Sequence, residues 1–320
     1  MPNSSPALTA TLLSSPSATP TIEQTLTPEP TRTPPLTATA SPTPTALPTD
    51  TPTLTPTPLS PLFLAPPVNF PLPTDPLYTV IDPSYRFSST QAGAPPIHHG
   101  IDLLVPFGSP VFAAADGVVL FSGNDTIRGP YGPPGRHDYF GNFIVLEHPA
   151  SLLADRGLGE NVFYTVYAHL SELDVQTGDI VLAGDQIGLV GYSGAALGPH
   201  LHFEVRLTGF TYADTFNPEM FLNLPGQGVL AGRFLSAKSN PLLAATFNLT
   251  ALDLDPPKTI YITTYEDAKL TARPPYNENF GLSLPPGHYQ ISYISGGVQT
   301  LEVEIREGEI TFIEINLGNE

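Results

Sequence analysis

Residues 198–205 read Gly-Pro-His-Leu-His-Phe-Glu-Val, and they contain the most informative feature of this chain, the histidines His200 and His202. In an extended strand, residues i and i+2 point to the same face and lie about 6.7 Å apart along the chain. Two imidazoles on one face suit a metal site, in which one ring binds the ion and the other works beside it.

Two more segments carry the chemistry. Residues 98–102 read His-His-Gly-Ile-Asp and residues 167–171 read Tyr-Ala-His-Leu-Ser, so five of the chain's eight histidines fall in three short segments. Nearby prolines and Gly100 oppose a helix over the first segment. In an extended segment i and i+4 still share a face, which keeps His98 and Asp102 together. His98, Asp102 and one of the two histidines near residue 201 would then form a three-ligand site.

Zinc with three nitrogen or oxygen ligands and one open position is the catalytic arrangement. The open position holds a water molecule whose pKa the metal lowers to about 7. Attack on an amide also needs a base, an acid for the leaving nitrogen and a group that stabilises the tetrahedral intermediate. His169 and the second histidine of the pair are available for these roles. Glu204 shares their face and could accept a ring N–H, which would set a tautomer.

Composition excludes several classes of partner. The formal charge is −18, from 12 basic and 30 acidic residues, and no basic run occurs. This argues against nucleic acid and against an anionic membrane surface. The chain has no Cys, so it has neither disulfides nor thiolate metal ligands. No apolar run reaches the roughly 18 residues of a transmembrane helix, and no signal peptide is visible in this chain.

The pattern along the chain predicts an all-β protein with four parts. Residues 1–60 are rich in Thr and Pro, and we expect a disordered stalk that acts as a spacer. Residues 61–96 form a lead-in segment. Residues 97–226 hold short β-rich runs separated by Gly and Pro, which indicate an antiparallel barrel-like or sandwich domain. Seven candidate strands over residues 228–320 fit a small β-sandwich of immunoglobulin-like size.

The ordered set of motifs resembles the lysostaphin-type zinc endopeptidases that cut peptidoglycan. The resemblance covers about residues 85–222, and its main motifs are His98-x-Gly100-x-Asp102, Tyr167-Ala168-His169, Gly191-Tyr192-Ser193-Gly194 and Gly198-Pro199-His200-Leu201-His202. It implies a β-barrel-like set of antiparallel sheets with a narrow groove. It also implies that His98, Asp102 and His202 bind Zn²⁺ and that His169 and His200 are catalytic, without dividing the base and oxyanion roles between these two.

Two insertions, residues 124–138 and 150–161, depart from the family pattern, and we expect both to reshape the groove walls. The remaining histidines are expected to take no part in the site. His99 should point away from the metal because neighbours alternate on an extended segment. His148 is expected at a strand end, whereas His137 and His288 are expected on the surface.

The leading hypothesis is a zinc-dependent endopeptidase that hydrolyses amide bonds in peptidoglycan cross-links or stem peptides, located outside the cell or in the envelope of a bacterium. We expect a monomer, although the sequence does not determine the oligomeric state. The alternative is a non-catalytic envelope module that binds peptidoglycan or activates another hydrolase. A cupin-like oxygenase would also place two histidines on a strand, but its carboxylate ligand should lie further downstream than Glu204.

Overall fold

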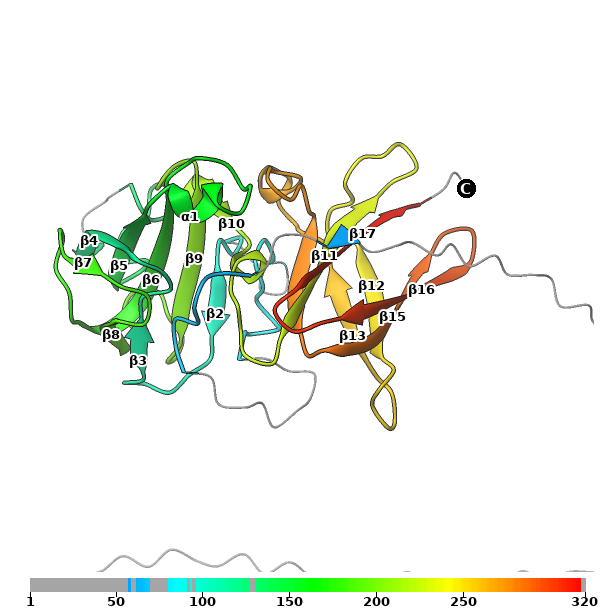
Figure 1. Ribbon diagram of the computed structural model, residues 1–320, viewed down its shortest axis with the longest axis horizontal. Coiled ribbons are helices and arrows are strands. Elements are labelled where there is room, and N and C mark those ends of the chain that lie inside the picture. Colours follow the sequence, from blue (N-terminus) through cyan, green and yellow to red (C-terminus); the bar gives the residue numbers. More distant parts are fainter. Residues whose placement is uncertain are drawn as a thin grey trace, which may run out of the picture. The chain divides into compact units, whose positions relative to one another are not determined.

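Strands dominate the described part of the chain, which confirms the expected all-β fold (Figure 1). The computed structural model describes residues 57–58, 62–69, 80–90, 93, 96–126 and 130–317. Almost all of the predicted disordered stalk lies outside these residues. Thr57–Pro58 is the exception, because it forms a short strand, β1, where the sequence predicts disorder. Within the described ranges, no helix has the length and apolar character to span a membrane.

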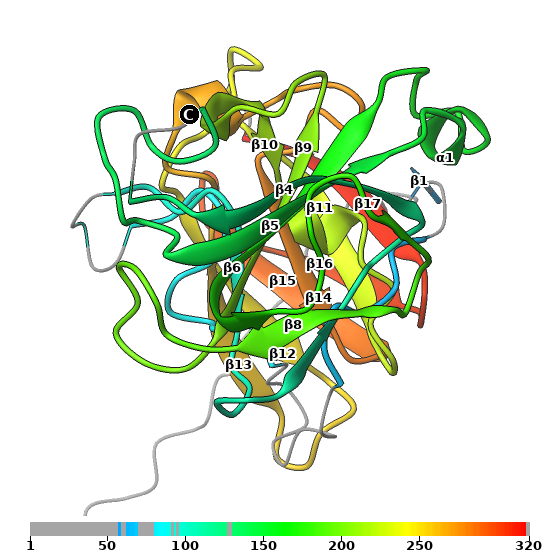
Figure 2. The ribbon, with the colours of Figure 1, turned by 90° about the vertical axis from the view of Figure 1, so that its left-hand side faces the viewer.

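The first half of the described chain forms one nine-stranded sheet. Its main path runs in the order β10-β9-β6-β5-β4-β7, with β2 paired to β9 and β8 paired to both β3 and β6; every pairing is antiparallel. Figure 2 shows β4, β5 and β6 running side by side in this sheet. The strands are Ile101–Leu103 (β2), Pro110–Phe112 (β3), Gly117–Asn124 (β4), Asn142–His148 (β5), Phe163–Leu173 (β6), Ile180–Val181 (β7), Gln186–Val190 (β8), Leu201–Leu207 (β9) and Thr215–Phe216 (β10).

The position of β9 inside this sheet determines the environment of the candidate site. All seven residues of β9 are buried. Its apolar side chains, including Phe203 and Val205, belong to the main hydrophobic core. The alternate residues His202, Glu204 and Arg206 point the other way and are buried as well. Since buried charged groups need partners, these three must satisfy one another or nearby groups.

The insertions have different structures. The first forms the loop between β4 and β5, and the second carries the single short α-helix of the described residues, Ser151–Ala154 (α1). The lead-in segment packs into the core through Leu64 and Ile81, which form isolated bridges to Leu222 and Leu103 respectively.

The second half forms two four-stranded sheets around a separate core, as in a sandwich. One has the order β13-β12-β15-β16 and the other β1-β17-β11-β14. The seven strands predicted here are present. Within this sandwich β11 and β17 are parallel, and β1, from the segment expected to be disordered, extends the sheet. The strands are Gly228–Leu235 (β11), Thr246–Ala251 (β12), Lys258–Thr263 (β13), Phe280–Leu284 (β14), Gly287–Ile294 (β15), Val298–Ile305 (β16) and Ile310–Asn316 (β17).

A buried polar junction joins the segment after β10 to the sandwich. Glu219 is fully buried, accepts hydrogen bonds from Arg86 at 2.8 and 2.9 Å, and accepts another from the main-chain N–H of Ser283 in β14. The Asn217 amide donates to the Tyr265 hydroxyl at 2.9 Å. Consistent with these contacts, all described residues belong to one compact unit.

Candidate active site

The paired strands β2 and β9 bring two of the expected ligands face to face. Asp102 and His202 are direct partners in the antiparallel ladder. Directly opposite residues have Cβ atoms about 5 Å apart, so these two side chains meet. Gly100 makes room beside them, because a Cβ at this position would lie 2.8 Å from Cε1 of the His202 ring. The glycine of the His98-x-Gly100-x-Asp102 motif is therefore required by close packing.

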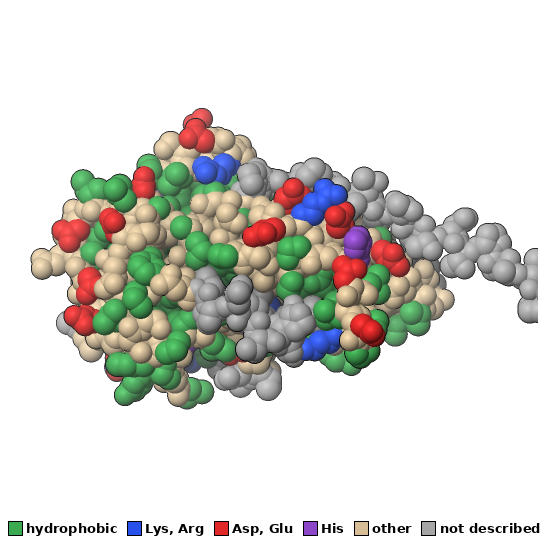
Figure 3. All heavy atoms as spheres, turned by 60° about the horizontal axis from the view of Figure 1, so that its bottom comes forward, with side chains coloured by type: hydrophobic (Ala, Val, Ile, Leu, Met, Phe, Trp, Pro, Cys, Tyr) green, Lys and Arg blue, Asp and Glu red, His purple; other side chains and the backbone are tan. Residues whose placement is uncertain are grey.

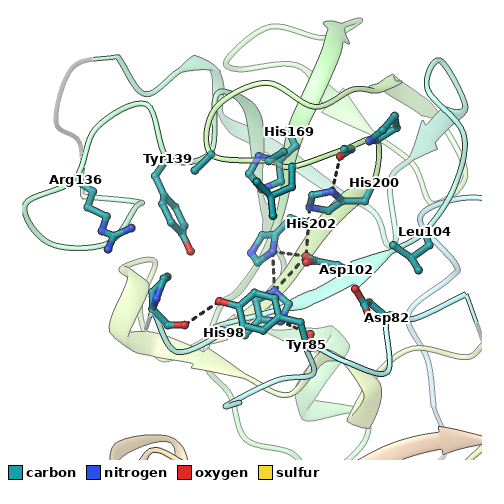
Figure 4. A pocket seen from close by; sticks show the side chains of 16 residues that line it. Asp82, Tyr85, His98, Asp102, Leu104, Arg136, Tyr139, His169, His200 and His202 are labelled. Carbon is teal, nitrogen blue, oxygen red and sulfur yellow. Dashed lines mark hydrogen bonds and ion pairs between the residues drawn. The ribbon is translucent and has the colours of Figure 1, made fainter. Parts of the chain in front are cut away.

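His98 completes a group of three ligand candidates (Figure 4). Its Nε2 atom lies 3.2 Å from Asp102 Oδ1 and 3.1 Å from His202 Nδ1. The latter two atoms are 2.9 Å apart. Atoms bound tetrahedrally to one zinc ion at roughly 2.1 Å would lie about 3.4 Å from one another. The three atoms thus have nearly the spacing that one shared ion requires.

Acceptors on the outer side of each ring orient both histidines of this group. His98 Nδ1 lies 2.7 Å from the carbonyl oxygen of Tyr85, and His202 Nε2 lies 3.0 Å from Glu204 Oε1. Because these oxygens only accept, the outer nitrogen carries the N–H in each neutral ring. The inner nitrogens then direct lone pairs toward each other and toward Asp102. This arrangement is repulsive without a positive charge between the side chains, so the donor set fits a metal cation.

The pKa shifts of Asp102 and His202 also indicate that the site favours a positive charge. Burial would lower the pKa of His202, but hydrogen bonds with Asp102 and Glu204 raise it to about 9. Burial also opposes ionisation of Asp102, yet His98 and His202 hold the pKa of this carboxyl well below its usual range. The site therefore stabilises a positive charge at the point where the side chains converge.

His169 and His200 lie beside the three ligand candidates, with ring centroids 4.8 Å apart. His200 Nε2 lies 3.6 Å from Asp102 Oδ1. The Nδ1 atoms of His169 and His200 lie 2.8 Å and 2.9 Å from the carbonyl oxygens of Ser193 and Gly198, to which they donate. In each neutral ring Nε2 then keeps a lone pair, and it can accept a proton or, once protonated, donate one.

The backbone at His169 is unusual. Its φ is 63°, in the left-handed region that non-glycine residues rarely enter. It sits where β6 changes partner, since Ala168 pairs with His202 of β9 whereas Leu170 pairs with β8. Burial, together with repulsion from His202 and His200, lowers the pKa of His169 to about 3. A neutral imidazole at pH 7 is consequently held next to the group.

Glu204 lies beside the His202 ring, as expected from the sequence. Its ion-pair partner, Arg206, was not anticipated. Arg206 is fully buried, and its Nε donates to Glu204 Oε2 at 2.7 Å. Its other nitrogens donate to the carbonyl oxygens of Phe210 and Tyr131. His202, Glu204 and Arg206 thus form a charged row along one face of β9, and the alternation of residues 202, 204 and 206 was the signal that could have revealed it.

Tyr85 is a second residue that sequence reasoning did not place in the site. Its ring stacks on His98 with a centroid separation of 4.0 Å and an interplanar angle of 4°. Its hydroxyl donates to the Pro96 carbonyl at 2.9 Å. Because the main-chain carbonyl of the same residue accepts from His98 Nδ1, Tyr85 fixes both the plane and the tautomer of this ring. No local pattern marks it, since the contact joins residues 85 and 98 across a loop.

A cavity of about 370 Å³ opens over these side chains. The first insertion contributes Arg136 to its wall, and Tyr139 follows directly, so the expectation for that loop is confirmed. The second insertion is fully described between residues 150 and 161, and none of its residues lines the cavity. The expectation that it shapes the groove is wrong, because it packs around α1 and places Leu153 in the main core.

The other histidines lie as expected. His99 Nδ1 lies 2.8 Å from both the Tyr212 carbonyl oxygen and the Thr215 hydroxyl, away from the three ligand candidates. His148 ends β5, and His137 and His288 are exposed.

Comparison with known proteins agrees with this geometry. Residues 96–215 match the sequence profile of Peptidase family M23. These residues form a peptidase M23 domain. The M23 domain contains all five residues expected to bind metal or to act in catalysis, and the resemblance noted in the sequence is confirmed.

Three proteins illustrate the similarity. Peptidoglycan DD-endopeptidase ShyA of Vibrio cholerae is 35% identical over 40% of this chain and 24% of its own length. Lysostaphin of Staphylococcus staphylolyticus is 33% identical over 42% of this chain and 24% of its own length. The chain thus spans about a quarter of these relatives. The crystallised catalytic domain of lysostaphin from Staphylococcus simulans is 27% identical, over 43% of this chain and 87% of that one, with a TM-score of 0.32.

Proposed function

We propose that this chain is a zinc-dependent endopeptidase that hydrolyses amide bonds in the cross-links or stem peptides of peptidoglycan. One observation carries the proposal: His98 Nε2, Asp102 Oδ1 and His202 Nδ1 converge within 3.2 Å of one another, with two further imidazoles beside them. The M23 domain and relatives named as peptidoglycan DD-endopeptidases support the choice of reaction and substrate.

Zinc is the metal that the donor set and the match to Peptidase family M23 together favour. Two imidazoles and one carboxylate form a three-ligand set of the kind that catalytic zinc sites use, with a fourth position open. Bound zinc would polarise the amide carbonyl and lower the pKa of a coordinated water. His98, Asp102 and His202 would hold the ion, Tyr85 and Glu204 would orient its two imidazole ligands, and Arg206 would neutralise the charge of Glu204.

His169 and His200 would carry the proton chemistry. Each has its Nδ1 hydrogen tied to a main-chain carbonyl, so each presents Nε2 to the cleft. One of them would take a proton from the attacking water at Nε2 and then give that proton to the leaving nitrogen, which completes hydrolysis. The other, in its protonated form, would donate a hydrogen bond from Nε2 to the oxygen of the tetrahedral intermediate.

The rest of the chain has no assigned catalytic part in this proposal. We place the reaction within residues 97–226 and treat residues 228–320 as an accessory β-sandwich, with residues 1–60 as a spacer. Since peptidoglycan lies outside the cytoplasmic membrane, the protein would work in the cell envelope or outside the cell, as a monomer.

The test uses the purified full chain on a suspension of bacterial cell walls. We expect the suspension to clear, a chelator to stop clearing, and added Zn²⁺ to restore it. Mass spectrometry of the released fragments would identify the bond that is cut. Clearing that persists with metal removed, or with His200→Ala in place of the native chain, would overturn the proposal. Zinc-loaded native chain that binds the walls without clearing them would favour the non-catalytic envelope module.

A further inference from the structure

The loop that carries Arg136 is anchored at the edge of the cleft. Asp125, at the start of the loop, accepts hydrogen bonds from the main-chain N–H groups of Tyr139, Phe140 and Gly141 at 3.0, 2.8 and 2.9 Å. These three bonds close the base of the loop. Arg136 lies just before the clamped residues, and its guanidinium carbon is 5.7 Å from the centroid of the Tyr139 ring.

Among the described residues that line the cavity, Arg136 is the only Lys or Arg. Among the described residues, no carboxylate lies within ion-pair distance of its guanidinium, and the side chain is exposed. By contrast, Arg86 and Arg206 each pair with a buried glutamate. Arg136 therefore presents an available cation at the mouth of the candidate active site.

The charge on the opposite side of the cleft has the other sign. Figure 4 shows Arg136 and Tyr139 on one side of the histidine group, and Asp82 with Leu104 on the other. A bound peptide would thus meet a cation at one end and a carboxylate with an apolar neighbour at the other.

The negative charge of the rest of the chain makes the single positive charge of Arg136 important for binding an anionic substrate. The chain has a formal charge of −18, and acidic side chains are spread over the face seen in Figure 3. Such a field repels an anionic substrate. A guanidinium at the cleft offsets that repulsion locally, and it matches a carboxylate because its planar fork can donate two parallel hydrogen bonds.

We propose that Arg136 is a specificity-determining residue that binds a free carboxylate of the peptide substrate on the Tyr139 side of the reacting amide. This inference rests on the proposed peptidase function and adds a substrate class to it: cross-linked peptides with an unmodified carboxylate are preferred over those in which it is amidated.

The test measures how efficiently the zinc-loaded full chain cleaves two forms of one substrate. Cross-linked muropeptide dimers are used as isolated and after their carboxylates have been converted to amides with carbodiimide and ammonia. We expect the native chain to prefer the free-acid form by roughly tenfold in kcat/KM, the effect of about one charge-assisted hydrogen bond. The preference should appear mainly in KM and should shrink as salt is added.

Three variants make the result specific. Arg136→Gln should cleave both forms with similar efficiency, whereas Arg136→Lys should keep part of the preference. Lys238→Gln removes the same charge from an exposed turn after β11 and should retain the full preference. If the native chain and Arg136→Gln show the same preference, the role of Arg136 is refuted while the peptidase function stands. If the native chain cleaves neither form, the proposed function itself fails.

Discussion

Asp102 and His202 face each other across the β2–β9 ladder, with Oδ1 and Nδ1 2.9 Å apart, although they are 100 residues apart in the sequence. Strand pairing therefore fixes the positions of two of the three ligand candidates, and the loop before β2 supplies the third, His98. A site built on a strand pair is held rigidly, which favours a fixed metal geometry.

Metal binding and turnover should separate between the two histidines of the motif. His202→Ala removes a ligand candidate and should lose bound zinc. His200→Ala should keep zinc and lose about 10²- to 10⁴-fold in turnover, the usual loss for a proton-transfer group. Elemental analysis and hydrolysis rates on the same samples provide the measurement. Equal loss of metal in both variants would show that the division between ligand and catalyst is wrong.

Glu204→Gln should weaken zinc binding, and it should also lower stability, because it breaks the buried ion pair with Arg206. The amide can still accept from His202 Nε2, but it lacks the charge that makes the ring a stronger ligand. We expect a loss of about 10- to 100-fold in metal affinity, measured by competition with a chromophoric chelator. Glu147→Gln on β5 is the matched control and should bind zinc like the native chain. An unchanged affinity in Glu204→Gln would exclude the orienting role.

The junction at Glu219 should contribute strongly to stability. In Glu219→Gln an NH₂ group replaces one carboxylate oxygen, and this group would face either the Arg86 guanidinium or the Ser283 N–H, both of which are donors. Breaking a buried ion pair costs roughly 3 kcal/mol or more, and a fall in Tm of roughly 10 °C is expected in calorimetry. Glu304→Gln, which breaks the exposed pair with Arg306, should leave Tm within experimental error. Similar small shifts in both variants would contradict this assignment.

His148 should make the protein less stable in acid. Burial lowers the pKa of His148 to about 4 from an ordinary value of 6.5. Between these two values the unfolded chain binds more protons than the folded one, so stability falls as the pH falls through this window. The loss at the acid end is about 3 kcal/mol, and it does not grow further below pH 4.

Denaturant unfolding of the metal-free protein at several pH values measures this effect. His148→Gln removes the titrating group, so its stability should depend less steeply on pH between 6.5 and 4 than that of the native chain. The other histidines titrate in both proteins and cancel in the comparison. Parallel curves would mean that His148 does not supply this acid sensitivity.

The sequence by itself determined the fold class, and the resemblance of its motifs to a known family implied the five residues of the candidate site. Short β-rich runs and turn residues are local patterns, and the histidine motifs keep their spacing along the chain. The same local information placed Glu204 beside His202, since a strand repeats every two residues.

Only the tertiary structure decided which groups orient and surround those residues. Tyr85 reaches His98 across a loop, and the guanidinium of Arg206, beyond its pair with Glu204, donates to the carbonyls of Tyr131 and Phe210. It also decided that the first insertion lines the cavity and the second does not. Such contacts depend on how distant segments pack, and packing is a sum of many weak interactions that no short stretch of sequence contains.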